Sequence, residues 1–247
     1  MTKKHFLNAL MLSAFVALTA CAGGGDSAPP QGIMPDDSSQ EGSFNPSAPS
    51  ENDAAGMTEA ATVSQSERDA ILKSYDYMDP NREVPTKALG NALVYFEKNK
   101  SKIRNKKYIS VIDFGKRSTQ KRFFIINVAT GKVMAIHVAH GKGSDADHDG
   151  YAEKFSNSPG SKASSIGYYL TGSTYQGSNG YSLKLDGLSS TNSNARGRAV
   201  VIHGASYVSE SNVIQGRSWG CPAVAMSLRT QVIDMLKGGS LIYAVAN

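Results

Sequence analysis

The chain has 247 residues and a formal net charge of +5, from 26 basic and 21 acidic side chains. It contains no internal repeat and no nucleic-acid-binding motif, and beyond its N-terminal segment no apolar run is long enough to span a bilayer. We therefore exclude a repeat protein and a protein with several membrane spans, and we expect no nucleic acid partner.

Residues 1–20 have the pattern of an export signal. Lys3 and Lys4 precede an apolar stretch that is short for a membrane span. Small residues stand directly before Cys21, and this pattern resembles the lipobox of bacterial lipoproteins. The resemblance implies cleavage before Cys21 and a lipid anchor on it; the alternative is an ordinary secretory signal with an incidental cysteine. Because residue 22 is not Asp, the sorting pattern of such lipoproteins favours the periplasm, at the inner leaflet of the outer membrane.

Residues 21–66 are rich in Pro, Gly, Ser and acidic residues and contain no Lys or Arg. Such a composition cannot bury enough apolar surface to offset chain entropy, so it predicts a disordered acidic tether. The tether has seven acidic side chains and the signal two lysines, so the remainder of the chain has a net charge of +10. That charge either solubilises the surface or attracts an anionic wall polymer or lipid head groups.

Residues 67–106 are expected to form a helical segment. Ser64 and Glu67 have the spacing of a capping box before a first helix. A second helix should begin near Thr86, bury one apolar stripe and end in the basic run 98–107.

Beyond residue 107 the hydrophobic period changes to two, which predicts a mainly β domain over 107–247, largely antiparallel, with helices at its edges. A long loop from His140 to Ser165 is expected to be functional or partly mobile. We expect a late helix at 226–236 and strands at 108–114, 122–128, 132–139, 167–171, 181–185, 199–203 and 241–245.

Cys221 is the candidate nucleophile. If Cys21 is lipidated, the mature chain has no second thiol to pair with Cys221. A thiol needs a base or a field that lowers its pKa, and His203, at the rim of a strand before Gly204, is the candidate base. Gly220 can supply unusual backbone geometry, so that its N–H and that of Cys221 point at an oxyanion. The alternative is an inert buried thiol and a structural histidine.

The order His203-Gly204, then Ser218-x-Gly220-Cys221, resembles the L,D-transpeptidase catalytic domain family, the YkuD-like enzymes. The likeness extends over nearly all of residues 107–247. Further segments that resemble one branch of the family are 111–114, 139–141, 155–157, 164–167, 181–187, 194–196 and 240–243.

The resemblance implies a mixed, barrel-like sheet and a cofactor-free enzyme that cross-links bacterial peptidoglycan. Cys221 would be the nucleophile and His203 its base, while Ser218 and the backbone of Gly220 shape the oxyanion pocket. The thiolate would attack the third residue of a stem tetrapeptide, and an amine of a second stem would resolve the thioester.

Water as the acceptor would make the protein an L,D-carboxypeptidase. A non-catalytic peptidoglycan-binding lipoprotein is the rival reading. A carbapenem is expected to acylate Cys221 only in an enzyme.

The expected substrate-binding residues are Arg217, Trp219, Gly204, His140 and Tyr168. Many family members have an arginine two positions after the cysteine, where this chain has Ala223, and Arg217 is a possible replacement. Two further tyrosines, Tyr169 and Tyr181, are equally compatible with the groove and with the core.

Residues 145–150 read Asp-Ala-Asp-His-Asp-Gly, which is how a calcium-binding loop begins. The closing glutamate is absent because the twelfth position is Ser156, although Glu153 could act as a displaced ligand. An acidic solvated loop is therefore the favoured interpretation. The three histidines His137, His140 and His148 do not form a zinc-binding pattern, so no catalytic metal is expected.

Overall fold

Eight strands and three helices make up the described part of the computed structural model, which comprises residue 57 and residues 63–246. No helix in these residues is long and apolar enough to cross a membrane. The predicted export signal, Cys21 and nearly all of the tether lie outside them. The elements are α1 (Gln65–Ser74), α2 (Thr86–Lys98), β1 (Tyr108–Asp113), β2 (Phe123–Asn127), β3 (Val133–Ile136), β4 (Gly167–Gly177), β5 (Gly180–Gly187), β6 (Val201–Ala205), β7 (Ala223–Ala225), α3 (Arg229–Leu236) and β8 (Leu241–Val245).

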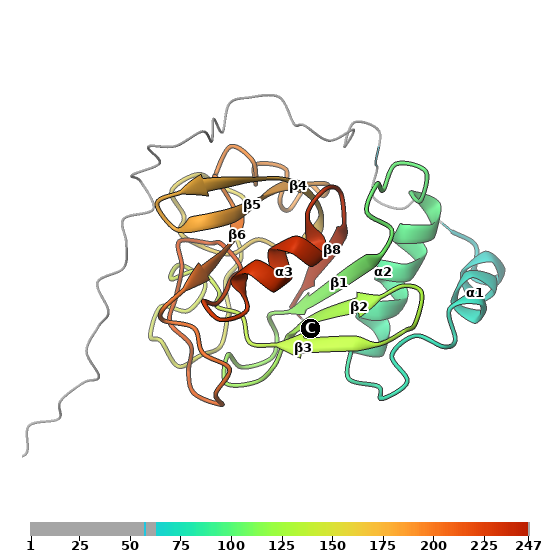
Figure 1. Ribbon diagram of the computed structural model, residues 1–247, viewed down its shortest axis with the longest axis horizontal. Coiled ribbons are helices and arrows are strands. Elements are labelled where there is room, and N and C mark those ends of the chain that lie inside the picture. Colours follow the sequence, from blue (N-terminus) through green and yellow to red (C-terminus); the bar gives the residue numbers. More distant parts are fainter. Residues whose placement is uncertain (1–56, 58–62, 247) are drawn as a thin grey trace, which may run out of the picture. The chain divides into compact units, whose positions relative to one another are not determined.

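The strands form one sheet in the order β3-β2-β1-β8-β4-β5-β6-β7 (Figure 1). Two neighbouring pairs, β1 with β8 and β6 with β7, are parallel, and the other pairs are antiparallel. The predicted class is thus confirmed: a mainly β domain with a mixed, largely antiparallel, barrel-like sheet.

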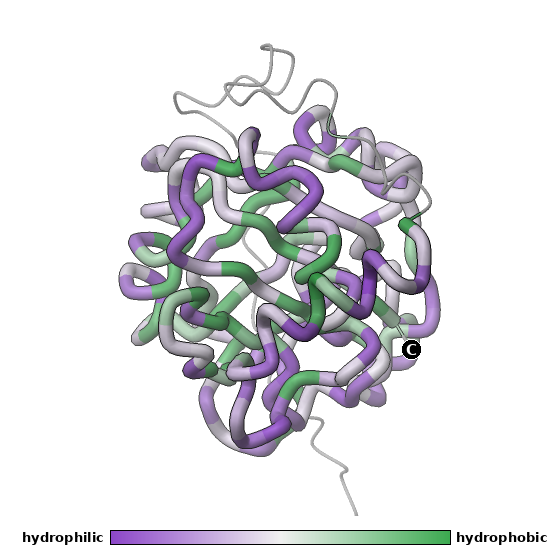
Figure 2. The backbone as a smooth tube through the Cα atoms, turned by 90° about the vertical axis from the view of Figure 1, so that its right-hand side faces the viewer, coloured by the Kyte–Doolittle hydropathy of each residue, from purple (hydrophilic) through white to green (hydrophobic). Residues whose placement is uncertain are grey.

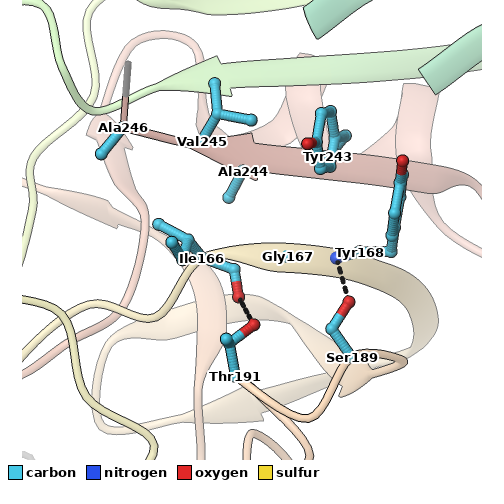
Figure 3. Close-up of a pocket in the computed structure, with 9 residues that line it drawn as sticks. All are labelled: Ile166, Gly167, Tyr168, Ser189, Thr191, Tyr243, Ala244, Val245 and Ala246. Carbon is cyan, nitrogen blue, oxygen red and sulfur yellow. Dashed lines mark hydrogen bonds between the residues drawn. The ribbon is translucent and has the colours of Figure 1, made fainter. Parts of the chain in front are cut away.

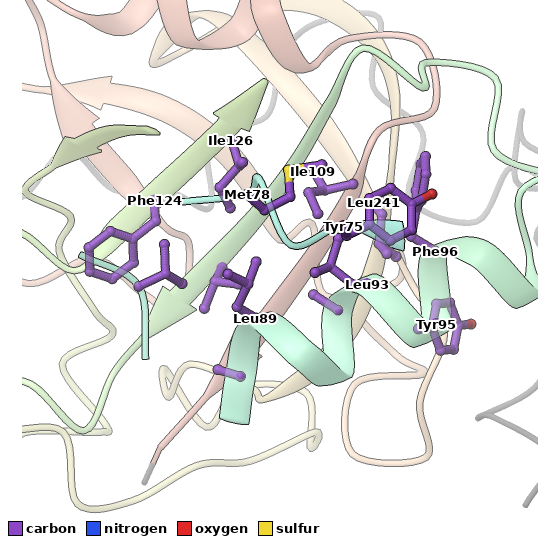
Figure 4. Packing of buried hydrophobic residues seen from close by; sticks show 14 of the residues in the cluster. Tyr75, Met78, Leu89, Leu93, Tyr95, Phe96, Ile109, Phe124, Ile126 and Leu241 are labelled. Carbon is purple, nitrogen blue, oxygen red and sulfur yellow. The ribbon is translucent and has the colours of Figure 1, made fainter. Parts of the chain in front are cut away.

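Both faces of the sheet are buried. On β1, Ile109 and Val111 belong to one hydrophobic cluster, while Ile112 belongs to the other. The first cluster includes the buried side of α2 (Figure 4), and the second includes that of α3. Five of the six residues of β1 are therefore buried in succession, as in a sheet covered on both sides. Figure 2 shows the hydrophobic stretches in the interior of the domain and hydrophilic ones along many turns.

The predicted helix signals agree with the structure. The hydroxyl of Ser64 accepts a hydrogen bond from the N–H of Glu67 at 3.2 Å and caps α1. Helix α2 begins at Thr86 and buries its apolar stripe against β1 and β8, although it ends at the first residue of the basic run 98–107. Because α2 shares a core with the sheet, it is part of the same folded unit.

The differences lie at element boundaries. Helix α3 begins at Arg229, three residues later than expected, and β4 continues to Gly177. The three-residue strand β7 was not predicted, because a periodic pattern cannot be recognised over so few residues. It nevertheless positions the candidate nucleophile, which precedes it by two residues.

Candidate active site

The two candidate catalytic residues are positioned by neighbouring strands, since His203 lies on β6 and Cys221 precedes β7 by two residues. His203 is on β6, and the parallel pairing of β6 with β7 places it opposite Ala223, two residues after Cys221. Both are buried, with 3% of His203 and 2% of Cys221 exposed. The strand continues through Ala205, so His203 lies within β6 rather than at its end as expected.

A backbone carbonyl orients the imidazole of His203. Its Nδ1 lies 3.1 Å from the carbonyl oxygen of Gly204, in the same strand. Because a carbonyl can only accept, Nδ1 carries the proton, and Nε2 is left as the basic nitrogen. Thus Gly204 contributes its carbonyl to the orientation of the ring. Its α-carbon has no room for a side chain, since an added Cβ would lie 2.8 Å from atoms of Met226 and Arg229.

Cys221 follows a tight turn that depends on Gly220 and Ser218. Gly220 has a φ of +118°, and a Cβ there would lie 2.7 Å from the carbonyl oxygen of Ala163. The buried hydroxyl of Ser218 accepts from the N–H of Gly220 at 3.1 Å and donates to the carbonyl of Cys221 at 2.6 Å. The N–H of Gly220 is therefore used inside the turn, contrary to the expectation that it faces an oxyanion.

Residues 161–165 cover this turn. The hydroxyl of Ser164 donates to the carbonyl of Gly220 at 3.4 Å, and the Ala163 carbonyl lies against the Gly220 backbone. The thiol of Cys221 itself lies 3.6 Å from the carbonyl oxygen of Ala199, a residue with a φ of +53°. A left-handed alanine is strained, and such strain is common next to functional groups.

Arg198 is a basic residue of the site that the sequence analysis missed. Its Nη2 donates to the carbonyl of Ala163 at 2.6 Å and would lie 3.2 Å from a Cβ added at Gly220. Burial lowers the pKa of Arg198, while Tyr169 and Cys221 oppose that effect by charge interaction. A guanidinium at this place favours the thiolate form of a nearby cysteine. The sequence signal that could have identified Arg198 is its position just before β6, the strand that carries His203.

The family to which the chain belongs follows from its sequence match. The model of the L,D-transpeptidase catalytic domain, YkuD_2, matches residues 80–245. The chain belongs to this family. Its match begins before α2, which is consistent with the shared core of α2 and the sheet.

Two solved structures are similar to this L,D-transpeptidase domain at low identity. One is the LD transpeptidase LdtMt1 in complex with imipenem, with 16% identity, a TM-score of 0.36 and coverage of 56% of this chain and 59% of that chain. The other is Bd1075 of Bdellovibrio bacteriovorus, with 12% identity, a TM-score of 0.35 and coverage of 57% and 48%. The chain thus spans less than two thirds of each of these proteins. None of the curated proteins compared with the chain matches it.

Two of the expected substrate-binding residues of the transpeptidase domain lie at the cysteine turn, residues 218–221. Trp219 is within the turn and Arg217 directly precedes it. Trp219 is half-buried, and the ammonium of Lys162 lies 4.1 Å from the centroid of its ring. Arg217 does not reach toward Ala223, because its Nη1 donates to the carbonyls of Asp145 and Ala146. The guanidinium beside the cysteine turn belongs to Arg198 instead.

Tyr168 lies on the opposite face of the sheet from Tyr169, because successive residues of β4 alternate. Its ring stacks between those of Tyr95 and Tyr243, at centroid distances of 3.9 and 4.3 Å. Tyr168 lines a cavity of about 260 Å³ (Figure 3) to which neither Cys221 nor His203 contributes. The expected contact of Tyr168 with substrate at the cysteine is therefore not seen, whereas Tyr169 is buried in the core and donates to the Ser165 carbonyl.

His140 is also not exposed to a substrate. It is 1% exposed, its Nε2 lies 2.9 Å from Asp145 Oδ2, and its Nδ1 lies 2.8 Å from Nη2 of Arg122. Since a guanidinium can only donate, Nδ1 accepts and Nε2–H donates to the carboxylate. His140 is thus a neutral link between two buried charged side chains.

This arrangement predicts a loss of stability in weak acid. Burial and the Arg122 guanidinium lower the pKa of His140 from 6.5 to about 4. Between these values the unfolded chain binds a proton that the folded chain does not, so the free energy of unfolding falls as the pH falls from 6.5 to 4. The expected loss from His140 is about 3 kcal/mol. Urea unfolding in chelator-containing buffer measures it, and NMR titration showing His140 protonated near pH 6.5 would contradict it.

The other two histidines have partners different from those of His140. His137 is fully buried and contacts Glu210 and the Thr119 carbonyl, in keeping with its predicted structural role. His148 contacts the carbonyl of Gln215. Within the described residues, the group able to hold a metal ion consists of Asp145, Asp147 and Asp149.

Proposed function

We propose that this domain is a cysteine L,D-transpeptidase that joins peptidoglycan stem peptides through a thioester on Cys221. The observation that carries the proposal is the fixed imidazole of His203, whose Nδ1 is bonded to the Gly204 carbonyl on a strand paired with the one that follows Cys221. The family match of residues 80–245 supports the reaction class.

In the proposed reaction, Nε2 of His203 takes the proton of the Cys221 thiol. The thiolate attacks the carbonyl of the third residue of a stem tetrapeptide, and the C–N bond to the terminal D-amino acid breaks. The imidazolium protonates that leaving amine. In the second half, His203 removes a proton from the amine of another stem as this amine attacks the thioester, which restores the thiol.

Access to the thiol requires a change from this structure. Cys221 is 2% exposed, and residues 161–165 cover the turn before it. We infer that a stem peptide reaches Cys221 when this segment moves aside. The movement would break the long bond from Ser164 to Gly220, the contact of Lys162 with the Trp219 ring and the bond from Arg198 to the Ala163 carbonyl.

Mass spectrometry of the purified chain after incubation with tetrapeptide muropeptides tests the proposal. We expect a thioester on Cys221 and cross-linked dimers among the products. Tripeptide monomers without dimers would assign L,D-carboxypeptidase activity instead. The absence of both products and of a carbapenem adduct would favour a non-catalytic wall-binding protein. The solved complex of LdtMt1 with imipenem is the reason for including this drug class.

We also propose that Cys21 carries a lipid that anchors the protein at the periplasmic side of the outer membrane. The pattern of residues 1–21 supports lipidation, and Ala22 in place of Asp supports the outer membrane. Metabolic labelling with palmitate should mark the wild-type chain and not the C21A variant, and equal labelling of both would refute it.

A further inference from the structure

The loop that follows His140 brings three carboxylates together. Asp145, Asp147 and Asp149 each place one oxygen atom within 4.8 Å of those of the other two. A hydrogen bond from the N–H of Glu153 to the carbonyl of Ser144, 2.9 Å long, closes the loop at its base. Three like charges this close repel one another unless a cation lies between them.

Asp145 provides a second observation that points to a ligand. Its side chain is completely buried. Oδ2 accepts from the N–H of Gly150 at 3.1 Å and contacts Nε2 of His140, but Oδ1 has no hydrogen-bond partner. Buried carboxylate oxygens are normally bonded, because an unsatisfied one costs free energy. Since Oδ2 is occupied, Oδ1 is the oxygen of Asp145 that is available to a cation.

The charges of Arg217 and Arg122 act favourably on the buried Asp145 carboxylate. In the part of the chain that the structure describes, neither Asp147 nor Asp149 forms an ion pair with Lys or Arg. The two nearby arginines, Arg117 and Arg217, bind backbone carbonyls of the loop. Desolvation and repulsion by the three aspartates raise the pKa of the exposed Glu153 carboxyl, so the negative field extends to this fourth acid.

We propose that Asp145, Asp147 and Asp149 bind a calcium ion. All three ligands are hard oxygens, which Ca²⁺ prefers. Ca²⁺ accepts flexible, irregular oxygen coordination, whereas Mg²⁺ needs nearly ideal octahedral geometry and loses its water reluctantly. Three carboxylates on one loop therefore favour calcium over magnesium. Because Ser156 replaces the bidentate glutamate of high-affinity loops, the expected dissociation constant is about 10⁻⁴–10⁻³ M.

The same loop supports the turn that carries Cys221. The N–H of Ser218 donates to the carbonyl of His140 at 2.9 Å, and the N–H of Lys142 donates to the carbonyl of Ser218 at 2.7 Å. Arg217 is bonded to the carbonyl of Asp145. A bound calcium ion would hold the loop in this conformation and thereby stabilise the cysteine turn, at a distance from the reacting atoms.

Thermal unfolding of the full chain with CaCl₂ or MgCl₂ tests the proposal. At 10 mM, calcium should raise the Tm of the wild type by about 3–8 °C, and magnesium by much less. The variant D147N/D149N should lose the shift, and its asparagines keep the acceptor that Asp149 offers to the Tyr151 N–H. The matched control D76N/E83Q removes two exposed carboxylates elsewhere and should keep it.

Three results would overturn the assignment: no shift in the wild type, a shift retained in D147N/D149N, or an equal response to magnesium. Hydrogen exchange then tests the link to the turn, since calcium should slow exchange in both 144–153 and 217–221. Slowing confined to 144–153 would refute that link. None of these readouts depends on enzymatic activity, so they remain valid if the proposed function fails.

Discussion

Replacement of Cys221 by alanine is expected to abolish release of the terminal D-residue from tetrapeptide stems, a loss of about 10³-fold or more. The reason is that no other thiol is within the site: Cys221 is the free cysteine of the described residues. The same variant should show no mass increase after incubation with a carbapenem. Product analysis by chromatography and intact-protein mass spectrometry measure the two effects.

A matched control separates loss of chemistry from loss of folding. Ser110 is fully buried on β1 outside the site, and its hydroxyl oxygen has no hydrogen-bond partner. S110A therefore removes one buried heavy atom, as C221A does, and should keep full activity. Activity of C221A close to that of S110A would refute Cys221 as the nucleophile.

Replacement of His203 should lower transfer by about 10²–10⁴-fold, the usual contribution of a general base. The informative variant is H203N, because its side-chain amide can still donate to the Gly204 carbonyl while it has no basic nitrogen. Alkylation of Cys221 by iodoacetamide at pH 7 should also slow, by about tenfold, because less of the thiol is then ionised.

H137N is the control for this experiment, since His137 is also fully buried but contacts Glu210 instead of the cysteine turn. It should leave the alkylation rate unchanged even if it lowers the Tm. If H203N is folded and alkylates as fast as H137N, His203 does not activate the thiol. If H203N does not fold, the pH profile of wild-type alkylation tests whether His203 activates the thiol. An apparent pKa of the Cys221 thiol near 8.5 would contradict activation.

The local features of the site could be predicted from the sequence because they depend on neighbours in the chain. A glycine before a cysteine predicts a turn with positive φ, and Gly220 has it. The carbonyl that orients His203 belongs to the adjacent residue. The strand predicted over residues 108–114 is confirmed by β1, although its residues are buried in succession because both faces of the sheet are covered.

Features that depend on residues far apart in the chain could not be predicted. Alternation along β4 puts Tyr168 and Tyr169 on opposite faces, but which face adjoins Cys221 depends on the order of strands in the sheet. Arg198 lies beside both Ala163 and Gly220, which are distant from it in the chain. His140 is bonded to Arg122, which precedes β2 and is distant from His140 in the chain.

The sequence by itself determined the residue types and the local geometry of a thiol, an imidazole and a glycine turn, because short-range sterics and hydrogen bonding act within a few residues. The tertiary structure decided that Arg198 is the cation near the thiol and which face of the sheet each tyrosine of β4 occupies. It also brought three aspartates together, one of which, Asp145, has a buried oxygen without a hydrogen-bond partner. Those outcomes are set by close packing between distant segments, which no single stretch of the chain encodes.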